Sequence, residues 1–215
     1  MKQSIIFGQN HVLMHPFLVY YLPFYMVVFV LLTFVLSSYR FYKQNGINPI
    51  TFRRTDTAHD FNGKVMRLLM LALAIAIGCF CAGKAYAYLL PIWYLEDLNW
   101  DMAGLVLLHA SLVLIVVAQI QMGISWRIGI DKQLKTPLVT HKLYAWSRNP
   151  IYLGILLCLL GLFFILPNIL TFFALLAGYF SMSIQIRLEE EFLLNQHGDT
   201  YTQYRQKVNR WFGRG

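Results

Sequence analysis

Long apolar runs are the feature that most restricts the fold of this chain. Three of them, at 17–38, 66–90 and 103–122, approach the ~20 residues that an α-helix needs to cross the hydrocarbon core of a bilayer. Only 13% of the 215 residues are charged, whereas a soluble domain carries about 25% charged residues. The sequence therefore predicts an all-α integral membrane protein.

The apolar run at 151–184 is too long for a single crossing. At 1.5 Å per residue it would extend about 51 Å, against a hydrocarbon core of about 30 Å. Pro167-Asn168 divides it, so we predict a helical hairpin near 151–186, with one helix over 151–166 and a second from 169 to about 196. The total is about five spans in one domain over 1–215, with three spans in 1–122 and a loop, hairpin and tail in 123–215.

Basic side chains are concentrated in three segments. Sixteen of the eighteen Lys and Arg residues fall in 39–67, 123–150 and 187–214. The positive-inside rule then places the amino terminus outside and the carboxyl terminus in the cytosol. The membrane is expected to be a bacterial inner membrane or, in a eukaryote, that of the endoplasmic reticulum. We interpret the net charge of +8 as a topology signal and an attraction to anionic membrane lipids, not as a sign of nucleic-acid binding. Lys84, near the outer end of the second span, is expected to snorkel to the interface.

This topology puts two polar stretches on the same cytosolic side. The first is the loop ending in Arg148-Asn149-Pro150, where Asn149 can cap a helix and Pro150 can occupy its first position. The second is Arg187-Leu188-Glu189-Glu190-Glu191, at the end of the last long helix. Gly198 is predicted to stop that helix, and Asp199 to cap a terminal helix on which Tyr201, Tyr204, Val208 and Trp211 share a face.

Both stretches also have a purely structural interpretation. The three glutamates can form an interfacial charge cluster paired with Arg187 and Lys142. The aromatic side chains of the tail can form a belt that anchors it to lipid headgroups. A shared cytosolic site is the alternative, because the loop and the tail lie on the same side.

The motifs of these stretches resemble those of a known enzyme family. LVTHKLYAWSRNPIYLG, then EExxL at 189–193, His197-Gly198, Tyr201, Tyr204 and Val208 are similar to the isoprenylcysteine carboxyl methyltransferases and their phospholipid-methyltransferase-like bacterial relatives. The similarity covers roughly 125–210. It implies a membrane enzyme that binds S-adenosylmethionine in a cytosolic pocket formed by the 123–150 loop and the C-terminal helices, with a lipophilic substrate entering from the bilayer.

The resemblance also implies which residues bind the cofactor. The family's contacts fall on Thr136, Pro137, Leu138, Val139, Tyr144, Asn149, Pro150, Ile151, Tyr152 and Glu189. Two positions depart from the family pattern: Asn149 replaces the His of Arg-His-Pro, and His141-Lys142-Leu143 lacks the Gly that commonly precedes the Tyr-containing turn. The family's substrate-contacting Arg corresponds to Gln185, and the nearest cation, Arg187, lies about 200° away around the helix. A prenylcysteine carboxylate acceptor is therefore not implied.

These residue types suit the chemistry of methyl transfer. A Glu can hold the ammonium of S-adenosylmethionine, backbone amides or a cation its carboxylate, and aromatic rings its sulfonium or adenine. Glu189, the loop backbone, Tyr144 and Tyr152 provide this set. An acceptor that must lose a proton would need a base, for which His141 is the nearest candidate, although a lone loop histidine can be merely solvated. The candidates for a catalytic role are thus His141, Gln185 and Arg187.

Two other functions are compatible with a helical membrane chain. One is an NADPH-dependent membrane reductase of the sterol type, and the other is a non-catalytic scaffold that keeps the fold.

No metal site is predicted, because Cys79, Cys81 and Cys158 lie in apolar spans and His11 and His15 lack a third ligand. His109, inside the third span, can either face a cavity or bond a neighbouring helix. The sequence specifies no oligomeric state.

Overall fold

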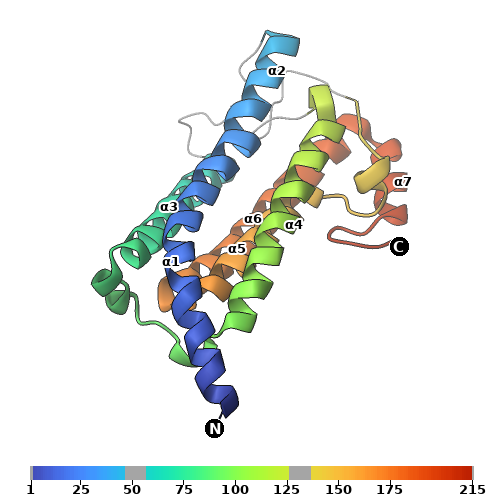
Figure 1. Ribbon diagram of the computed structural model, residues 1–215. Helices are drawn as coiled ribbons and strands as arrows, with labels where there is room; N and C mark the ends of the chain where they lie inside the picture. The colour runs from blue at the N-terminus through green and yellow to red at the C-terminus, as the bar shows by residue number, and fades with distance from the viewer. Residues whose placement is uncertain (1, 47–56, 126–136, 215) are drawn as a thin grey trace.

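The computed structural model describes residues 2–46, 57–125 and 137–214, and it is helical throughout (Figure 1). The long α-helices are α1 (Lys2–Val30), α3 (Ala58–Cys81), α4 (Leu98–Met122), α5 (Pro150–Ile165) and α6 (Ile169–His197). The short elements are the π-helix η1 (Leu31–Leu36), the helices α2 (Ser37–Asn45) and α7 (Asp199–Lys207), and the 3-10 turns η2 (Gly83–Leu89), η3 (Trp93–Leu95), η4 (Gly123–Ser125) and η5 (Lys142–Ala145). In this part of the chain the β-type pairings are isolated bridges, so the predicted all-α class is confirmed.

The helices account for the predicted membrane spans. Four are long and apolar enough to cross a membrane, over His15–Lys43, Ala58–Cys81, Leu98–Met122 and Ile169–His197, and α5 is a shorter apolar helix. The boundaries of the second and third spans were wrong. α3 begins at Ala58 and ends at Cys81, because Gly83 adopts a left-handed φ of +66° that interrupts the helix. Lys84 consequently lies exposed in η2, outside the span.

The third span begins earlier than its hydropathy indicates. The Asp97 side chain accepts from the backbone N–H of Asn99 and caps α4 at Leu98, five residues before the predicted start. Asp101, which precedes the predicted start of this span, is therefore in the first turn of α4 and buried. The start of α4 is thus set by a capping side chain and not by the first residue of the apolar run.

The predicted hairpin is present and its turn is tightly bonded. Asn168 accepts from the backbone N–H of Thr171 at 3.0 Å, and the Thr171 hydroxyl accepts from the backbone N–H of Asn168 at 3.3 Å, which forms a capping box at the start of α6. The backbone N–H of Ile92 donates to Pro167 O at 2.7 Å. The α5–α6 turn and the segment after η2 therefore lie at the same end of the bundle.

The opposite end of the bundle carries the basic segments. Figure 1 shows α2, the carboxyl end of α4 and α7 on one side, and the amino terminus and the α5–α6 turn on the other. The described parts of 39–67, 123–150 and the tail thus share one end, as their charge predicts. The direction in which this end faces across the membrane stays a prediction.

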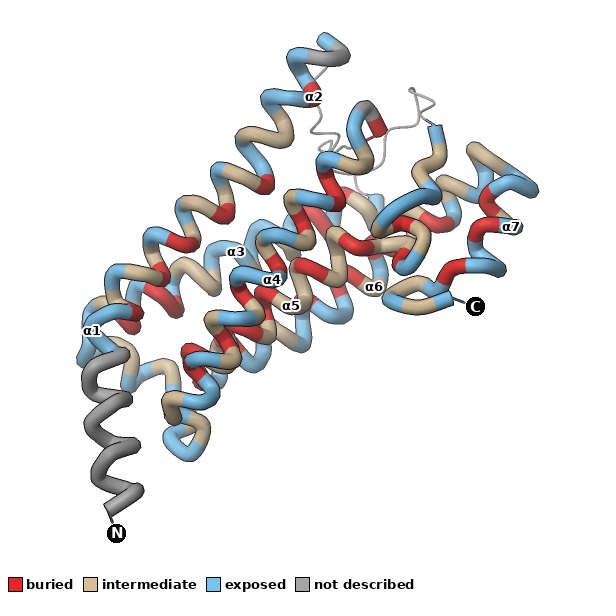
Figure 2. The backbone as a smooth tube through the Cα atoms, turned by 45° about the vertical axis from the view of Figure 1, so that its right-hand side comes forward, coloured by how far each residue is buried: buried red, intermediate tan, exposed pale blue. Residues whose placement is uncertain are grey.

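Close helix packing places α5 against α4. A Cβ added to Gly104 would lie 2.7 Å from Gly161 O, and one added to Gly161 would lie 2.9 Å from Gly104 O, so glycine is required at both positions. Figure 2 shows buried positions on the facing sides of α4, α5 and α6, and exposed positions along the outer faces of α4 and α6. Many of these exposed positions are Phe, Leu, Val and Tyr, as expected of a surface that contacts lipid.

Candidate active site

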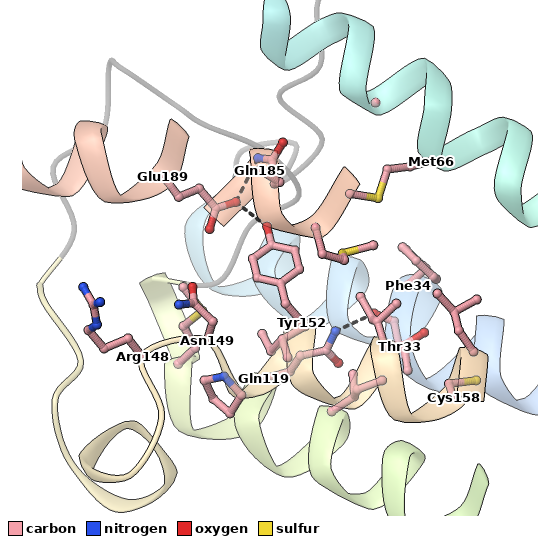
Figure 3. Close-up of a pocket in the computed structure, with 18 of the residues that line it drawn as sticks. Thr33, Phe34, Met66, Gln119, Arg148, Asn149, Tyr152, Cys158, Gln185 and Glu189 are labelled. Carbon is pink, nitrogen blue, oxygen red and sulfur yellow. Dashed lines mark hydrogen bonds between the residues drawn. The ribbon is translucent and has the colours of Figure 1, made fainter. Parts of the chain in front are cut away.

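A cavity of about 480 Å³ opens between the helices and extends to the loop over 137–149 (Figure 3). It is lined by side chains of α1, η1, α3, α4, α5, α6 and α7. Nine of the ten predicted cofactor residues line it: Pro137, Leu138, Val139, Tyr144, Asn149, Pro150, Ile151, Tyr152 and Glu189. The tenth, Thr136, lies outside the described residues. The structure therefore brings Glu189 next to a loop segment that begins, at Pro137, more than 50 positions earlier in the sequence.

The loop reaches the cavity through the start of α5. Pro150 occupies the first helical turn as predicted. The predicted capping by Asn149 is wrong, because its side chain makes no cap hydrogen bond and instead donates from Nδ2 to Arg210 O at 3.1 Å. The backbone N–H of Asn149 donates to the Ser147 hydroxyl at 3.1 Å. Asn149 thus ties the loop to the carboxyl-terminal tail.

Glu189 is held by two neighbouring side chains. The Tyr152 hydroxyl and the Gln185 amide both donate to its Oε1, the amide at 3.0 Å. Figure 3 shows the Tyr152 ring extending from α5 across the cavity toward Glu189 on α6. These two hydrogen bonds fix the position of this carboxylate oxygen.

Gln185 is bonded on all sides by protein groups. Its Nε2 lies 3.2 Å from His59 Nδ1 and 3.0 Å from Glu189 Oε1, and its Oε1 accepts from Asn62 Nδ2 at 3.1 Å. The Ser181 hydroxyl donates in turn to Asn62 Oδ1 at 2.6 Å. With 2% of its surface exposed, Gln185 positions Glu189 and offers no further donor to a ligand.

His59 and Asn62 were not predicted as site residues. They lie in the first turns of α3, in a segment that precedes the predicted second span at 66–90. The available signal was Thr57, whose hydroxyl accepts from the backbone N–H of Asp60 and caps α3. Because this cap moves the helix start to Ala58, His59 and Asn62 come to face α6.

The remaining catalytic candidates lie away from the cavity. His141 is exposed and is not a lining residue. Arg187 is also exposed, and its Nη1 donates to Ser183 O one turn earlier at 2.7 Å. Of the three candidates, only Gln185 lines the cavity, and its amide is used internally.

Glu190 forms an ion-paired clamp with two arginines. Its carboxylate lies 3.1 Å from Arg148 Nη1, and accepts from Arg210 Nε at 3.0 Å and Nη2 at 2.7 Å. The predicted pairing with Arg187 and Lys142 is therefore wrong for Glu190. The hydrogen bond to Glu190 raises the pKa of the Arg210 guanidinium. The clamp joins the loop, the end of α6 and the tail after α7.

Tyr201 and Tyr204 of α7 are buried, so the lipid-anchoring belt predicted as an alternative is wrong for these two residues. Tyr201, Tyr204 and Val208 form a cluster with Leu138 and Leu193. The Tyr204 hydroxyl donates to Tyr144 O at 2.6 Å. Burial raises the pKa of both Tyr204 and Tyr144 above the usual range of a phenol. α7 thus closes the loop end of the cavity.

Trp211 does not share this buried face. Its ring stacks on Tyr179 of α6, with ring centroids 6.3 Å apart. Gly198 ends α6 as predicted, but Asp199 is the first residue of α7 and not its cap, because Gly198 occupies the capping position.

The other end of the cavity is an apolar arm between the helices. Its walls include Phe29 of α1, Leu73 and Ile77 of α3, and Cys158 and Leu162 of α5. From Pro150 to Leu162 the wall follows α5 for about 18 Å. His109 is not a lining residue; its Nε2 lies 3.2 Å from the Tyr21 hydroxyl, so it bonds the neighbouring α1. The cavity can therefore hold a polar group at the loop and a hydrocarbon chain in the arm.

Comparisons with known proteins support the resemblance seen in the sequence. Residues 100–200 match the model of the phospholipid methyltransferase family. The chain is 38% identical over 96 residues to a protein-S-isoprenylcysteine O-methyltransferase of Schizosaccharomyces pombe, and 37% identical over 82 residues to one of Tribolium castaneum. These segments cover 42% and 38% of this chain but only 40% and 29% of the relatives.

The fold also matches a solved structure. The structure of the eukaryotic intramembrane Ras methyltransferase, isoprenylcysteine carboxyl methyltransferase, superimposes with a TM-score of 0.56 at 18% identity, and covers 98% of this chain and 85% of that one. The helical membrane fold is thus shared over nearly the whole chain. The comparisons do not favour the reductase alternative.

Proposed function

We propose that this chain is an integral membrane methyltransferase that uses S-adenosylmethionine and acts on a lipophilic or small amphiphilic acceptor. The observation that carries the proposal is one continuous cavity, in which nine predicted cofactor residues at the loop end adjoin an apolar arm inside the bundle. Its volume of about 480 Å³ lies within the usual range of about 300–1,000 Å³ for small-molecule sites.

The side chains at the loop end fit the groups of this cofactor. The Glu189 carboxylate, oriented by Tyr152 and Gln185, can bind the ammonium. The backbone over 138–140 is neither helix nor strand, so its N–H groups can bind the carboxylate. The rings of Tyr144 and Tyr152 line the same space and can pack against the sulfonium or the adenine.

For methyl transfer, the protein mainly has to align the acceptor with the methyl group. When bound, S-adenosylmethionine supplies an activated methyl group and leaves as a neutral thioether. The clamp around Glu190 and the buried cluster of α7 hold the loop closed over the cavity, which excludes water from the reacting groups. A thiolate, carboxylate or tertiary amine acceptor needs no base, in keeping with the position of His141 outside the cavity.

The acceptor is proposed to come from the bilayer. Cavity-lining Phe34 of η1 and Met70 of α3 are partly exposed on the bundle surface, which supports an entry between these two helices for an amphiphile already dissolved in lipid. The cavity's loop end lies with the basic segments and faces the cytosol in the proposed orientation, with the amino terminus outside. The host membrane is an endoplasmic reticulum or a bacterial inner membrane.

Calorimetric titration of the detergent-purified protein tests this proposal. S-adenosylhomocysteine is expected to bind with a micromolar Kd, and NADPH, the control ligand, is expected not to bind. Binding of NADPH alone would replace the proposal by the reductase. Binding of neither ligand to protein with a cooperative thermal transition would make the chain a scaffold.

A further inference from the structure

Arg67 is a charged side chain in an apolar helix, and the cofactor proposal gives it no role. It lies nine residues into α3, lines the cavity and is exposed. Its Nε donates to Gly63 O of its own helix at 3.2 Å, and it forms no ion pair with a described carboxylate. A guanidinium has five N–H donors, so the bond from Nε leaves the donors of both Nη atoms to bind a ligand.

The other charged and amide groups discussed for this cavity have protein partners. Arg148, the second arginine that lines it, is ion-paired with Glu190, a carboxylate that it shares with Arg210. Gln185 uses its amide on His59, Asn62 and Glu189. Among the described lining residues, Arg67 is therefore the cation that can bind an incoming anion.

The position of Arg67 lies between the two ends of the cavity. A helical side chain leans toward the amino end of its helix, and the bond to Gly63 O shows this direction for Arg67. Gly63 follows Asn62, which contacts Gln185, so the guanidinium lies about one helical turn from the network that positions Glu189. Met66, Met70 and Phe34 supply apolar walls around it.

We propose that Arg67 binds a carboxylate or phosphate group of the amphiphile whose chain occupies the apolar arm. The planar guanidinium can pair with two oxygens of either anion. Apolar walls reduce solvent screening and strengthen this pairing relative to bulk water. That this amphiphile is the methyl acceptor rests on the proposed function; the anion site itself rests on Arg67 and the cavity.

Lys64 provides a matched control for the experiment. It lies one turn before Arg67 on α3 and is exposed, but it does not line the cavity. Replacing either residue by Gln removes one positive charge from the same end of the same helix. An effect caused by general attraction to anions would therefore be the same in both variants.

The experiment measures binding of hexadecyl phosphate, hexadecanoate and hexadecanol to the full chain in neutral detergent, with and without S-adenosylhomocysteine, at about pH 8, where carboxylates are ionised. The wild type is expected to bind at least one of the two anions about tenfold or more tighter than the alcohol, as charge-assisted hydrogen bonds imply. Arg67→Gln is expected to abolish this preference. Lys64→Gln is expected to keep it, and Arg67→Lys to keep part of it.

The outcomes separate the two proposals. A preference for one anion only identifies that anion as the ligand class. A preference that survives Arg67→Gln, or that Lys64→Gln reduces equally, overturns the anion site. Failure to bind S-adenosylhomocysteine overturns the methyltransferase proposal instead, and leaves the amphiphile result to be judged by the same variants.

Discussion

Replacing Glu190 by Gln should release the carboxyl-terminal tail from the loop over 137–149. The Glu190 and Arg148 side chains are 10% and 8% exposed, so the substitution leaves a buried guanidinium without a counter-ion. Removing one partner of such a pair costs about 3–5 kcal/mol. Because the Gln amide keeps one acceptor, we expect about 2–3 kcal/mol here, which is about 30- to 150-fold in the equilibrium for local opening.

Amide hydrogen exchange followed by mass spectrometry measures this opening directly. The N–H groups of Arg148 and Gly213 join the loop to the tail through backbone hydrogen bonds to Asn209 O and Trp146 O, and their exchange should accelerate by the factor above. Glu191 is adjacent but exposed, so Glu191→Gln should change exchange by about twofold or less. Equal acceleration in both variants, or none in Glu190→Gln, would refute the clamp.

Two further predictions concern packing and pH. Gly161→Leu should lower the thermal transition temperature of the detergent-solubilised protein by several degrees, because even a Cβ at this site would lie 2.9 Å from Gly104 O. Gly78 has no atom within 4 Å of an added Cβ, so Gly78→Leu should leave the transition temperature nearly unchanged. Burial raises the pKa of Tyr204 and Tyr144, so their contribution to stability is complete below the unfolded value of about 10 and is lost as pH rises through the folded values. The resistance of the tail to proteolysis should then be constant from about pH 6 to pH 9 and fall above about pH 10. If this resistance were already lost below pH 9, the two tyrosines would not be the groups responsible.

The helices could be predicted from the sequence because apolar content and charge are local signals. The hairpin at Pro167-Asn168 and the shared end of the basic segments follow from span length and from the positions of Lys and Arg. Helix ends were less accurate, since Asp97 and Thr57 set them through single hydrogen bonds. Apolar periodicity carries no information on such caps.

The partners of polar side chains could not be predicted in the same way. Glu190 meets Arg148 and Arg210, and Gln185 meets Asn62, which is 123 positions away. These contacts depend on the relative rotation of α3, α5 and α6, which one sequence does not specify. The grouping of the predicted cofactor residues around one cavity could be predicted from the sequence. The segment 137–152 and Glu189 belong to two stretches that were predicted to lie at the same end of the bundle.

The most direct test of the account is whether Glu189 holds the cofactor. Titration of wild type, Glu189→Gln and Glu191→Gln with S-adenosylhomocysteine compares two isosteric changes on the same turn of α6. Loss of a charge-assisted contact to the ammonium should weaken binding about tenfold or more for Glu189→Gln, and about twofold or less for the exposed Glu191→Gln. Equal effects of the two substitutions would show that the cofactor does not occupy this end of the cavity.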